Sequence, residues 1–598
     1  MTKKILLILI LLYGAHNYAL AQHTEQEDSS RFYKDLENLA KKNKVTKLIH
    51  KVFFKTVAVP PKPIIKKGKK PKSRAKLKSV YYTKFEGKPI RDVIITTLDP
   101  FGYKLNDTTV SPRGVLQKSG NTLHIKTRLS AVRNLLLFRT NQPFDSLFVK
   151  ESERLIRTQS YVREVTIYPV AAGKKSDSVD VFVRVLDLWS IVVNVGTSLN
   201  KTIVDITERN FLGLGHRFEN GFPGQFKTGE YAYQSNYLVP TIANTYISAR
   251  LEYLISEQKL HSTSLDIERP FYSAFTKWAW GATFIEQSYH DFPDTVPDNS
   301  FKSFTQDYWG GRAYQIFKGN SEEKRSTNFV LAARYTRLHY IEKPYTYYSD
   351  DNTYLVSAGL STRKYRQDTY IFNYSVTEDV PVGRAYNITT GFQNNVRQWY
   401  LGLRAAWGNY YHWGYISTHL EYGTFLNGSK TGVFSGEINY FTGLFQLGKW
   451  KFRQFIKPQL TLGIRKPEKI TLTNEFGILG FTADSITGTR RAVVLLQTQS
   501  YAPWRILGFR FGPYFICALG MIGDDANGFK KSRLYAEYGL GVLIKNDYLV
   551  LNTFQFSLNF YPIIPGAGSN IFKTNRYRTY YYGLRDFDIG KPSIISYQ

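Results

Sequence analysis

From about residue 191 onward, the chain is a succession of short segments in which apolar and polar residues alternate. Clear examples are NTYISARLEYLIS, STSLDIERPFYS, YISTHLEYGTFL and NTFQFSLNFYPII, and polar stretches such as HDFPDTVPDNS and KGNSEEKRS separate such segments. A period of two places successive side chains on opposite faces of a strand. A run of about 400 residues of this kind, without helical signals, predicts a large antiparallel β structure.

The aromatic content favours a membrane-embedded form of this structure. The chain contains 44 Tyr, 40 Phe and 9 Trp, and aromatic residues are dense beside the turn-like segments. Transmembrane β-barrels combine short alternating strands with aromatic girdles, which a soluble array of β-sandwiches does not explain. No stretch after the N-terminus approaches about 18 consecutive apolar residues, so helical membrane spans are excluded. At roughly 50 residues per hairpin, residues 191–598 are predicted to form a closed transmembrane antiparallel β-barrel of about 16 strands.

The N-terminus has the pattern of a secretory signal peptide. Lys3 and Lys4 precede an apolar run over residues 5–13, and a small-residue cleavage pattern ends at Ala21, so residues 1–21 are predicted to be removed. The single cysteine, Cys517, cannot form an intramolecular disulfide. The net charge of +31 would indicate nucleic acid in a cytoplasmic protein. In an exported protein it favours anionic lipid head groups or an acidic periplasmic partner, and we predict no nucleic acid.

Two further regions precede the alternating segments. Residues 22–79 are predicted to contain one broken amphipathic helix or two short ones, and then a basic, Pro/Lys-rich linker. The linker is either a solvated spacer or a lipid- or partner-binding segment. Residues 80–190 read as strand, helix, helix, strand, strand, which is one small α+β domain. In it, Asp145 and Ser146 are well placed to cap a helix, and YVREVTIYPV is a strand with Val165 and Ile167 on one face and Val162 on the other.

A domain of this kind directly before a large barrel resembles the BamA/TamA-type outer-membrane protein assembly superfamily, whose soluble repeats are POTRA domains. The segment FDSLFVKESERLIRTQSYVREVTIYPV is similar to a POTRA helix that leads into an edge strand, here with Val162, Val165 and Ile167. The segment ITERNFLGLGHRFENGF resembles the first barrel strand of the family, with Asn210, Gly213 and Gly215.

A third similarity lies in NEFGILGF, which stands where the family carries a V-R-G-F/Y knot in the loop after the eleventh strand. The knot residues here are Gly477, Leu479, Gly480 and Phe481. In the family the knot arginine pairs with an aspartate of an F-x-D-x-G-like strand. Here Leu479 replaces the arginine, and the facing strand FICALGMIGDD has Ala518 and Gly520 at the D-x-G positions.

Loss of both members of this ion pair is physically consistent, because one unpaired charge in a poorly hydrated lumen would cost about 3–5 kcal/mol. The resemblance then implies that the knot docks through apolar contacts of Leu479 and Phe481, with Gly477 and Gly480 permitting the turn. The alternative is that these glycines only mark a bend in a loop.

The resemblance also implies that the first and last strands meet at a closing seam. Gly213 and Gly215 would weaken the first strand. Gly590 and Pro592 of YYGLRDFDIGKPSIISYQ would weaken the last, because proline donates no ladder hydrogen bond. A labile seam would act as a lateral gate at which a client strand pairs with an exposed edge, and the POTRA-like domain would offer a similar edge. Alternatively, Pro592 lies outside the ladder and the seam stays shut.

We therefore expect a bacterial outer-membrane protein, with its N-terminal region in the periplasm, that assists protein insertion or translocation. The implied partners are outer-membrane lipids and unfolded outer-membrane or secreted client proteins, with periplasmic chaperones or accessory lipoproteins as further candidates. The absent ion pair and the single POTRA-like domain leave open a passive pore or receptor barrel without insertase activity. No Ser/His/acid grouping, phosphate loop or zinc motif recommends itself, so no enzyme, cofactor or metal site is predicted.

Overall fold

The computed structural model describes residues 81–597, except for 106–110, 113–114, 174–175, 198–200, 226–231, 257–259, 290–300, 344–348, 375, 429, 474–476, 484, 507–508, 547–553 and 575–582. The predicted signal peptide (1–21) and the predicted helical segment and linker (22–79) lie outside the described residues. In the described part of the chain, no helix has the length and apolar character needed to cross a membrane.

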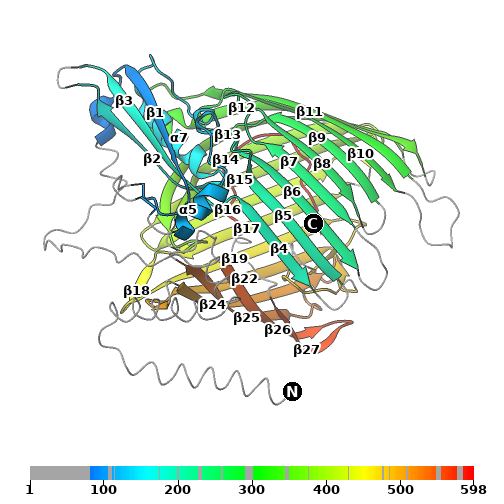
Figure 1. Ribbon diagram of the computed structural model, residues 1–598. Coiled ribbons are helices and arrows are strands. Elements are labelled where there is room, and N and C mark those ends of the chain that lie inside the picture. Colours follow the sequence, from blue (N-terminus) through cyan, green and yellow to red (C-terminus); the bar gives the residue numbers. More distant parts are fainter. Residues whose placement is uncertain are drawn as a thin grey trace, which may run out of the picture.

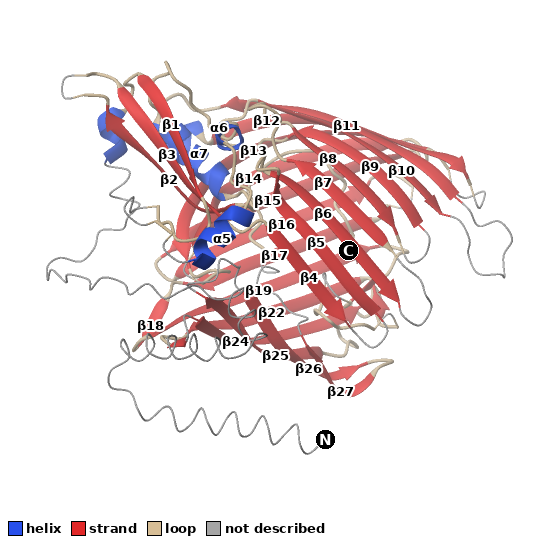
Figure 2. Ribbon diagram, in the orientation of Figure 1, coloured by secondary structure: helices blue, strands red, loops and turns tan. Residues whose placement is uncertain are grey.

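Residues 81–190 form a small α+β domain at one mouth of a large sheet of strands (Figures 1 and 2). Its elements are η1 (Thr83–Phe85), β1 (Ile90–Leu98), α5 (Val115–Leu123), α6 (Leu129–Arg133), α7 (Ser146–Arg157), β2 (Val162–Ala171) and β3 (Val179–Asp187). This is the expected order, with three helices rather than two between the first and second strands. The sheet order is β1-β3-β2, with β1 parallel and β2 antiparallel to β3.

The domain has its own core, centred on β3. The four valines at alternate positions of β3 are fully buried: Val179, Val181, Val183 and Val185. Helix α7 packs on this sheet, and Asp145 caps its N-terminus by accepting hydrogen bonds from the backbone N–H groups of Leu147 and Phe148. Such a cap satisfies donors that have no partner within the helix.

The remaining strands form one antiparallel sheet, which curves into a barrel (Figure 2). Among the described residues the sheet has 22 strands: β4 (Ile191–Thr197), β5 (Lys201–Phe211), β6 (His216–Gln225), β7 (Tyr233–Val239), β8 (Ser248–Ile255), β9 (Leu260–Arg269), β10 (Trp278–Tyr289), β11 (Phe301–Gln315), β12 (Thr327–Glu342), β13 (Asp351–Thr369), β14 (Thr377–Gln393), β15 (Gln398–Tyr411), β16 (Gly414–Phe425), β17 (Gly432–Thr442), β18 (Phe445–Leu447), β19 (Trp450–Ile464), β22 (Arg490–Tyr501), β23 (Arg505–Ile506), β24 (Phe509–Gly523), β25 (Tyr535–Asn546), β26 (Phe554–Ile564) and β27 (Gly568–Thr574). A short helix, α8 (Glu322–Arg325), precedes β12, and β20 (Ile470–Thr471) pairs with β21 (Thr487–Gly488) in the loop before β22.

The predicted fold class, a transmembrane antiparallel β-barrel preceded by a small α+β domain, is confirmed. The strand number exceeds the expected 16 even when β18 and β23 are counted as continuations of β17 and β22, since each pair shares one neighbour, β19 or β24. The estimate of roughly 50 residues per hairpin was too long for this chain, since several of its strands are joined by tight turns. One such turn joins β15 to β16 at residues 412–413.

The two faces of the sheet differ in the way that a membrane-spanning barrel requires. On β13, Tyr354 and Val356 are about half exposed, whereas their neighbours Leu355 and Ser357 are 3% and 1% exposed. Large apolar side chains are exposed in the same way on many strands around the sheet, for example Ile388, Leu403 and Phe556. The outward face is therefore an apolar, aromatic-rich surface suited to lipid, and the inward face lines a lumen.

The order of strands brings β27 next to β4, which is the order of a barrel. Ladders with defined register join the strands from β4 round to β27, with β18 and β23 paired to β19 and β24. The first strand, β4, and the last, β27, are neighbours in the strand order, and we call their junction the seam.

Two predictions about the seam are wrong. The first strand of the sheet is β4, so Asn210, Gly213 and Gly215 do not belong to it: Asn210 is the second-last residue of β5, and both glycines lie in the turn before β6. Gly590 and Pro592 do not belong to a last strand either, because residues 583–597 are outside the sheet. The sequence pattern misled here because an extended segment that contacts a wall on one side alternates in the same way as a strand.

Candidate functional site: an occupied lumen beneath a docked domain

The C-terminal segment, residues 583–597, lies inside the barrel. Its contacts are with inward-facing side chains of the wall: Ser361 Oγ donates to the carbonyl of Phe587, and Tyr400 Oη accepts from the backbone N–H of Ile595 at 2.8 Å. Figure 1 marks the C-terminus within the outline of the barrel. We call residues 583–597 the lumenal segment.

The lumenal segment runs from one mouth of the barrel to the other. Antiparallel strands place successive turns at alternate mouths. Asp586 contacts Arg363 near the end of β13, at the mouth where the α+β domain sits, which we call the domain mouth. Tyr597 donates to the carbonyl of Thr489 at 2.9 Å, beside the loop that joins β19 to β22 at the far mouth. The segment therefore crosses the lumen from end to end.

Charged groups of the wall hold the lumenal segment at several positions. The Arg363 guanidinium contacts the Asp586 carboxylate at 2.8 and 2.9 Å. Lys591 forms an ion pair with Asp307, which also pairs with Arg334 at 2.8 Å. Further contacts of this kind are Arg585 with Glu421, Arg404 with the carbonyl of Asp588, and Arg334 with the carbonyl of Pro592.

Apolar side chains of the lumenal segment fit over glycines of the wall. Phe587 is fully buried and stacks on the His419 ring, with ring centroids 5.5 Å apart. A Cβ atom on Gly408 would lie 2.5 Å from Phe587, and one on Gly359 would lie 2.6 Å from Ile589. Contacts this close do not occur between real side chains, so the wall has room for Phe587 and Ile589 only because glycine stands there.

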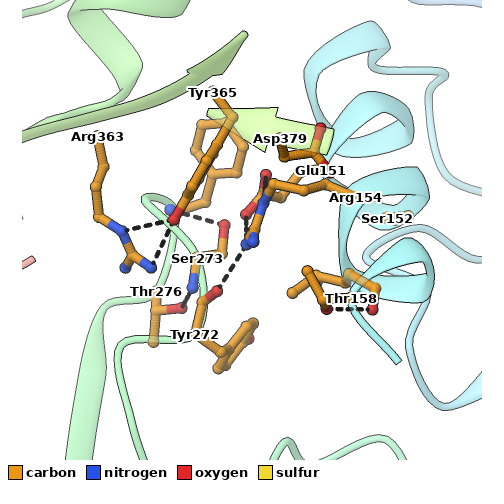
Figure 3. A network of polar contacts seen from close by, with 12 residues as sticks. Glu151, Ser152, Arg154, Thr158, Tyr272, Ser273, Thr276, Arg363, Tyr365 and Asp379 are labelled. Atoms are coloured by element: carbon orange, nitrogen blue, oxygen red, sulfur yellow. Dashed lines mark hydrogen bonds and ion pairs between the residues drawn. The ribbon is translucent and has the colours of Figure 1, made fainter. Parts of the chain in front are cut away.

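The α+β domain is fixed to the domain mouth by arginines. Arg157 of α7 pairs with Asp379 at the start of β14, with Nε 2.8 Å from Oδ2. Arg154, also on α7, donates to the carbonyl of Tyr272 at 3.1 Å (Figure 3). At the N-terminal end of the helix, Arg325 of α8 pairs with the capping residue Asp145 at 2.6 Å. The domain is thus held to the barrel by charge pairs at both ends of α7.

One polar cluster joins the domain, the wall and the lumenal segment. The Arg154 guanidinium lies over the Tyr365 ring, 4.1 Å from its centroid. The Tyr365 hydroxyl donates to the Asp586 carboxylate, which Arg363 also holds. Figure 3 shows Arg154 reaching from α7 toward Tyr272, with Tyr365 and Arg363 on the barrel side. These contacts therefore connect the domain, the barrel wall and the lumenal segment to one another.

Electrostatics keep the carboxylate of this cluster charged. Arg363, the Tyr365 hydroxyl and the backbone N–H of Phe587 all donate to the Asp586 carboxylate, and such contacts favour its charged form. Burial would lower the pKa of Arg157 in the α+β domain, but Asp379 and Glu153 raise it above its ordinary value. The contacts at the domain mouth are therefore ion pairs at neutral pH.

The residues predicted to weaken the first strand instead join barrel and domain. Asn210 is fully buried, and its amide donates to Thr127 Oγ1 at 2.9 Å while its Oδ1 accepts from the backbone of Gly215. The carbonyl of Gly213 accepts from the backbone N–H of Arg128 at 2.8 Å. Gly215 lies against the Tyr161 ring of the domain, where a Cβ atom would be 2.8 Å from the hydroxyl.

The predicted knot folds into the lumen from the far mouth. Phe481 is fully buried, Leu479 is 8% exposed, and both belong to one apolar cluster with Ala518 of β24. Gly520 faces this loop, since a Cβ atom there would meet Leu472 at 2.8 Å. Gly480 has φ +74, Gly477 packs against the backbone of Leu472, and Lys573 of β27 donates to the carbonyl of Gly480 at 2.7 Å. The structure thus brings the knot residues and the facing strand together.

The predicted edge strand is β2, which lies at the edge of the domain sheet. Val162, Val165 and Ile167 are all buried in the domain core. Val162 was predicted on the opposite face, which is wrong, because an irregular register between Val162 and Glu164 shifts the alternation. The edge is also partly covered: Tyr82 and Tyr81 donate to the carbonyls of Ile167 and Pro169, and Glu153 accepts from the backbone of Ile167.

Sequence reasoning missed the lumenal segment and its wall partners Arg363, Tyr365 and Asp307. One available signal was the charge density of RDFDIGK, which is high for a strand that faces lipid on one side. Among the residues that the structure describes, no group of three or more His, Cys, Asp or Glu side chains is arranged to hold a metal ion.

Fold and site together define a class: a transmembrane β-barrel whose lumen holds an extended segment of its own chain and whose mouth carries an α+β domain. No model of a known family matches the chain, and no curated protein sequence matches it. Its strand arrangement is similar over most of its length to solved barrels of the BamA and CdiB type.

Three solved structures illustrate that similarity. CdiB from Escherichia coli aligns with 8% identity and a TM-score of 0.39, over 93% of this chain and 98% of that one. CdiB from Acinetobacter baumannii aligns with 11% identity and a TM-score of 0.36, over 82% and 73%. BamA from Haemophilus ducreyi lacking POTRA domains 1–3 aligns with 12% identity and a TM-score of 0.31, over 81% and 84%. The likeness is one of general architecture.

Proposed function

We propose that this protein is a bacterial outer-membrane barrel that assists the insertion or translocation of other polypeptides, with the α+β domain in the periplasm as a POTRA-like receiver of clients. The observation that carries the proposal is the α+β domain fixed over one mouth of a barrel whose first and last strands, β4 and β27, meet at one seam. A seam that opens offers backbone donors and acceptors to an incoming strand. The proposal includes no catalytic step.

The α+β domain supports the same function by its position. It is fixed over the domain mouth, so a chain that reaches the barrel from that side first meets the domain. Pairing of a client strand with β2 requires displacement of the Tyr81, Tyr82 and Glu153 side chains from its edge. We therefore assign the first contact with clients to the domain and the strand pairing to the seam.

The test combines depletion of the protein with disulfide locks across the seam. In a Cys517→Ser background, Val193→Cys is combined in turn with Asn570→Cys, Phe572→Cys and Thr574→Cys, and the pair that cross-links is used for complementation. Depletion is expected to lower the levels of outer-membrane proteins, and the locked variant is expected to restore them only after reduction. A matched lock at Leu360 and Tyr386, which are in register on β13 and β14 and both face outward, should restore them without reduction.

Restoration by the seam-locked variant without reduction would refute lateral opening. A second candidate function, a plugged receptor or pore barrel without insertase activity, is favoured by one observation, the lumenal segment that fills the lumen. If depletion leaves the outer-membrane proteome unchanged, the assembly function is refuted and this second function is favoured. Uptake or conductance measurements then identify the solute.

A further inference from the structure

We propose that the inner wall formed by β11–β16 is a binding site for an extended polypeptide, and that the lumenal segment is its exchangeable occupant. The ligand class is a peptide in extended conformation with an acidic–aromatic–acidic–aliphatic run followed by a cation, as in Asp586 to Lys591. The proposal rests on the proposed function for its biological role, since an incoming client would compete for the same wall. Its physical content does not depend on that function.

The lumenal segment is attached to the wall by side chains and not by a ladder. Among the described residues, it makes no backbone–backbone hydrogen bond to a barrel strand. Its carbonyls accept instead from wall side chains, as those of Phe587 and Asp588 do from Ser361 and Arg404. Release of the segment therefore leaves every strand pairing of the barrel intact, which is the property expected of a ligand and not of a structural strand.

The features that fit this occupant belong to the wall strands themselves. The spaces for Phe587 and Ile589 come from glycines within β15 and β13, and the charges that hold the segment belong to strands whose pairing it does not share. An acidic residue meets Arg363, and a cation five residues later meets Asp307. Another peptide with the same pattern would meet the same spaces and charges, so specificity resides in the wall.

The second half of the segment is held less completely than the first. Phe587 and Ile589 are 0% and 3% exposed, whereas Ser593 and Ser596 are exposed to the lumen. A cavity of about 240 Å³ lies between this half and the wall, beside Arg404, Glu421 and residues 590–591 and 593–596. The segment is thus anchored tightly near the domain mouth and loosely toward its end, which gives a competing chain a place to begin displacement.

The tight end of the segment lies where the α+β domain docks. Tyr365 donates to Asp586, and Arg154 of α7 lies over the Tyr365 ring. Movement of α7 away from the mouth removes one neighbour of the Tyr365 side chain and so weakens its hold on Asp586. A client that shifts the domain would therefore favour release of the segment, which couples arrival at the domain to opening of the wall.

The experiment measures exchange of the segment in the full-length, folded barrel. A specific protease site is inserted between Thr574 and Gly583, the barrel is folded in detergent micelles, and the segment is cut from β27 afterwards. A fluorescent synthetic peptide of residues 583–598 is then added, and fluorescence anisotropy and mass spectrometry follow its exchange for the cut segment. We expect saturable binding of one peptide per barrel.

Variants of the peptide test the named contacts without altering the barrel. Phe587→Ala in the peptide is expected to weaken binding by about 100-fold, because it empties the space over Gly408. Asp586→Asn is expected to weaken it by about 10-fold or more. On the barrel, Gly463→Ala is expected to speed exchange, since the three nearest atoms to its Cβ all belong to Tyr597, and Gly436→Ala is the matched control with only ordinary contacts.

Two outcomes would overturn the proposal. One is that the cut segment never exchanges unless the barrel unfolds, which would make it an integral part of the fold. The other is that a scrambled peptide of the same composition binds as well as the native sequence. Clients and seam opening play no part in this measurement. A negative exchange result would therefore not contradict the proposed function, and a negative result with the seam lock would not contradict the binding site.

Discussion

At the scale of single residues, charge pairs hold the α+β domain to the barrel. Arg157 and Asp379 have side chains only 13% and 10% exposed, so each is costly to bury without the other. Arginine suits this position because its planar fork contacts both carboxylate oxygens, at 2.8 and 3.2 Å, while another of its nitrogens reaches Glu153. The pair therefore fixes the orientation of α7 as well as its position.

Replacement of Arg157 by methionine is expected to destabilise docking of the domain by about 3–5 kcal/mol, because it leaves the Asp379 carboxylate buried without its main partner. The double variant Arg157→Met/Asp379→Leu should recover most of this loss. Hydrogen exchange of α7 in the detergent-solubilised protein measures the effect. Equal loss of protection in the single and double variants would show that the ion pair does not set the docking energy.

At the scale of elements, the β5–β6 turn shows what a local motif does and does not predict. The glycines of NFLGLG were expected within a strand, but Gly213 and Gly215 have φ of +73 and +76 and lie in a tight turn. The motif contains no information that the carbonyl of Lys126, far away in sequence, lies 2.5 Å from where a Cβ of Gly213 would be. This close contact with the domain makes the turn part of the docking surface, and the local sequence does not encode the contact.

Gly213→Ala is expected to destabilise the protein more than Gly566→Ala does. Both positions have positive φ, +73 and +82, so both substitutions bear a backbone cost of about 1–2 kcal/mol. A Cβ atom at Gly213 would meet a backbone carbonyl of the domain, whereas one at Gly566 would have no atom within 4 Å. Chemical denaturation of the two variants should differ by about 2 kcal/mol. Indistinguishable midpoints would mean that the turn does not press on the domain.

The sequence was sufficient for the architecture and insufficient for the lumen. Alternation of apolar residues fixes which face of each strand meets lipid, as Val356 and Ser357 illustrate. It does not distinguish a strand in the sheet from an extended segment against the wall, and so Gly590 and Pro592 were placed in a strand that does not exist. The pairing of Asp586 with Arg363 joins positions more than 200 residues apart, and no local pattern encodes it.

At the scale of the whole molecule, charged groups of the domain, the barrel and the lumenal segment lie in contact at the domain mouth. The charged form of Asp586 stabilises the bound segment, because Arg363 and the Tyr365 hydroxyl donate to its carboxylate. Stability that depends on a charged carboxylate is present above the ordinary carboxyl range and is lost as the pH falls and the group is protonated.

Retention of the cut lumenal segment is therefore expected to be constant from about pH 8 to about pH 5 and to decline below about pH 4, where a free aspartate is protonated. The Asp586→Asn barrel, cut in the same way, should lose its segment faster at neutral pH and show no such acid dependence. Exchange rates of the fluorescent peptide over this range provide the measurement. A wild-type profile that rises toward alkaline pH would contradict the assignment.

The path of residues 583–597 also determines from which side of a membrane each part of the chain can be reached. Tyr597 lies beside the β19–β22 loop, at the mouth remote from the α+β domain. A short epitope appended after Gln598 should consequently be accessible to antibodies on intact cells, while one placed in the α+β domain should become accessible only after the envelope is permeabilised. Together, the two labels would determine the orientation of the barrel in the membrane.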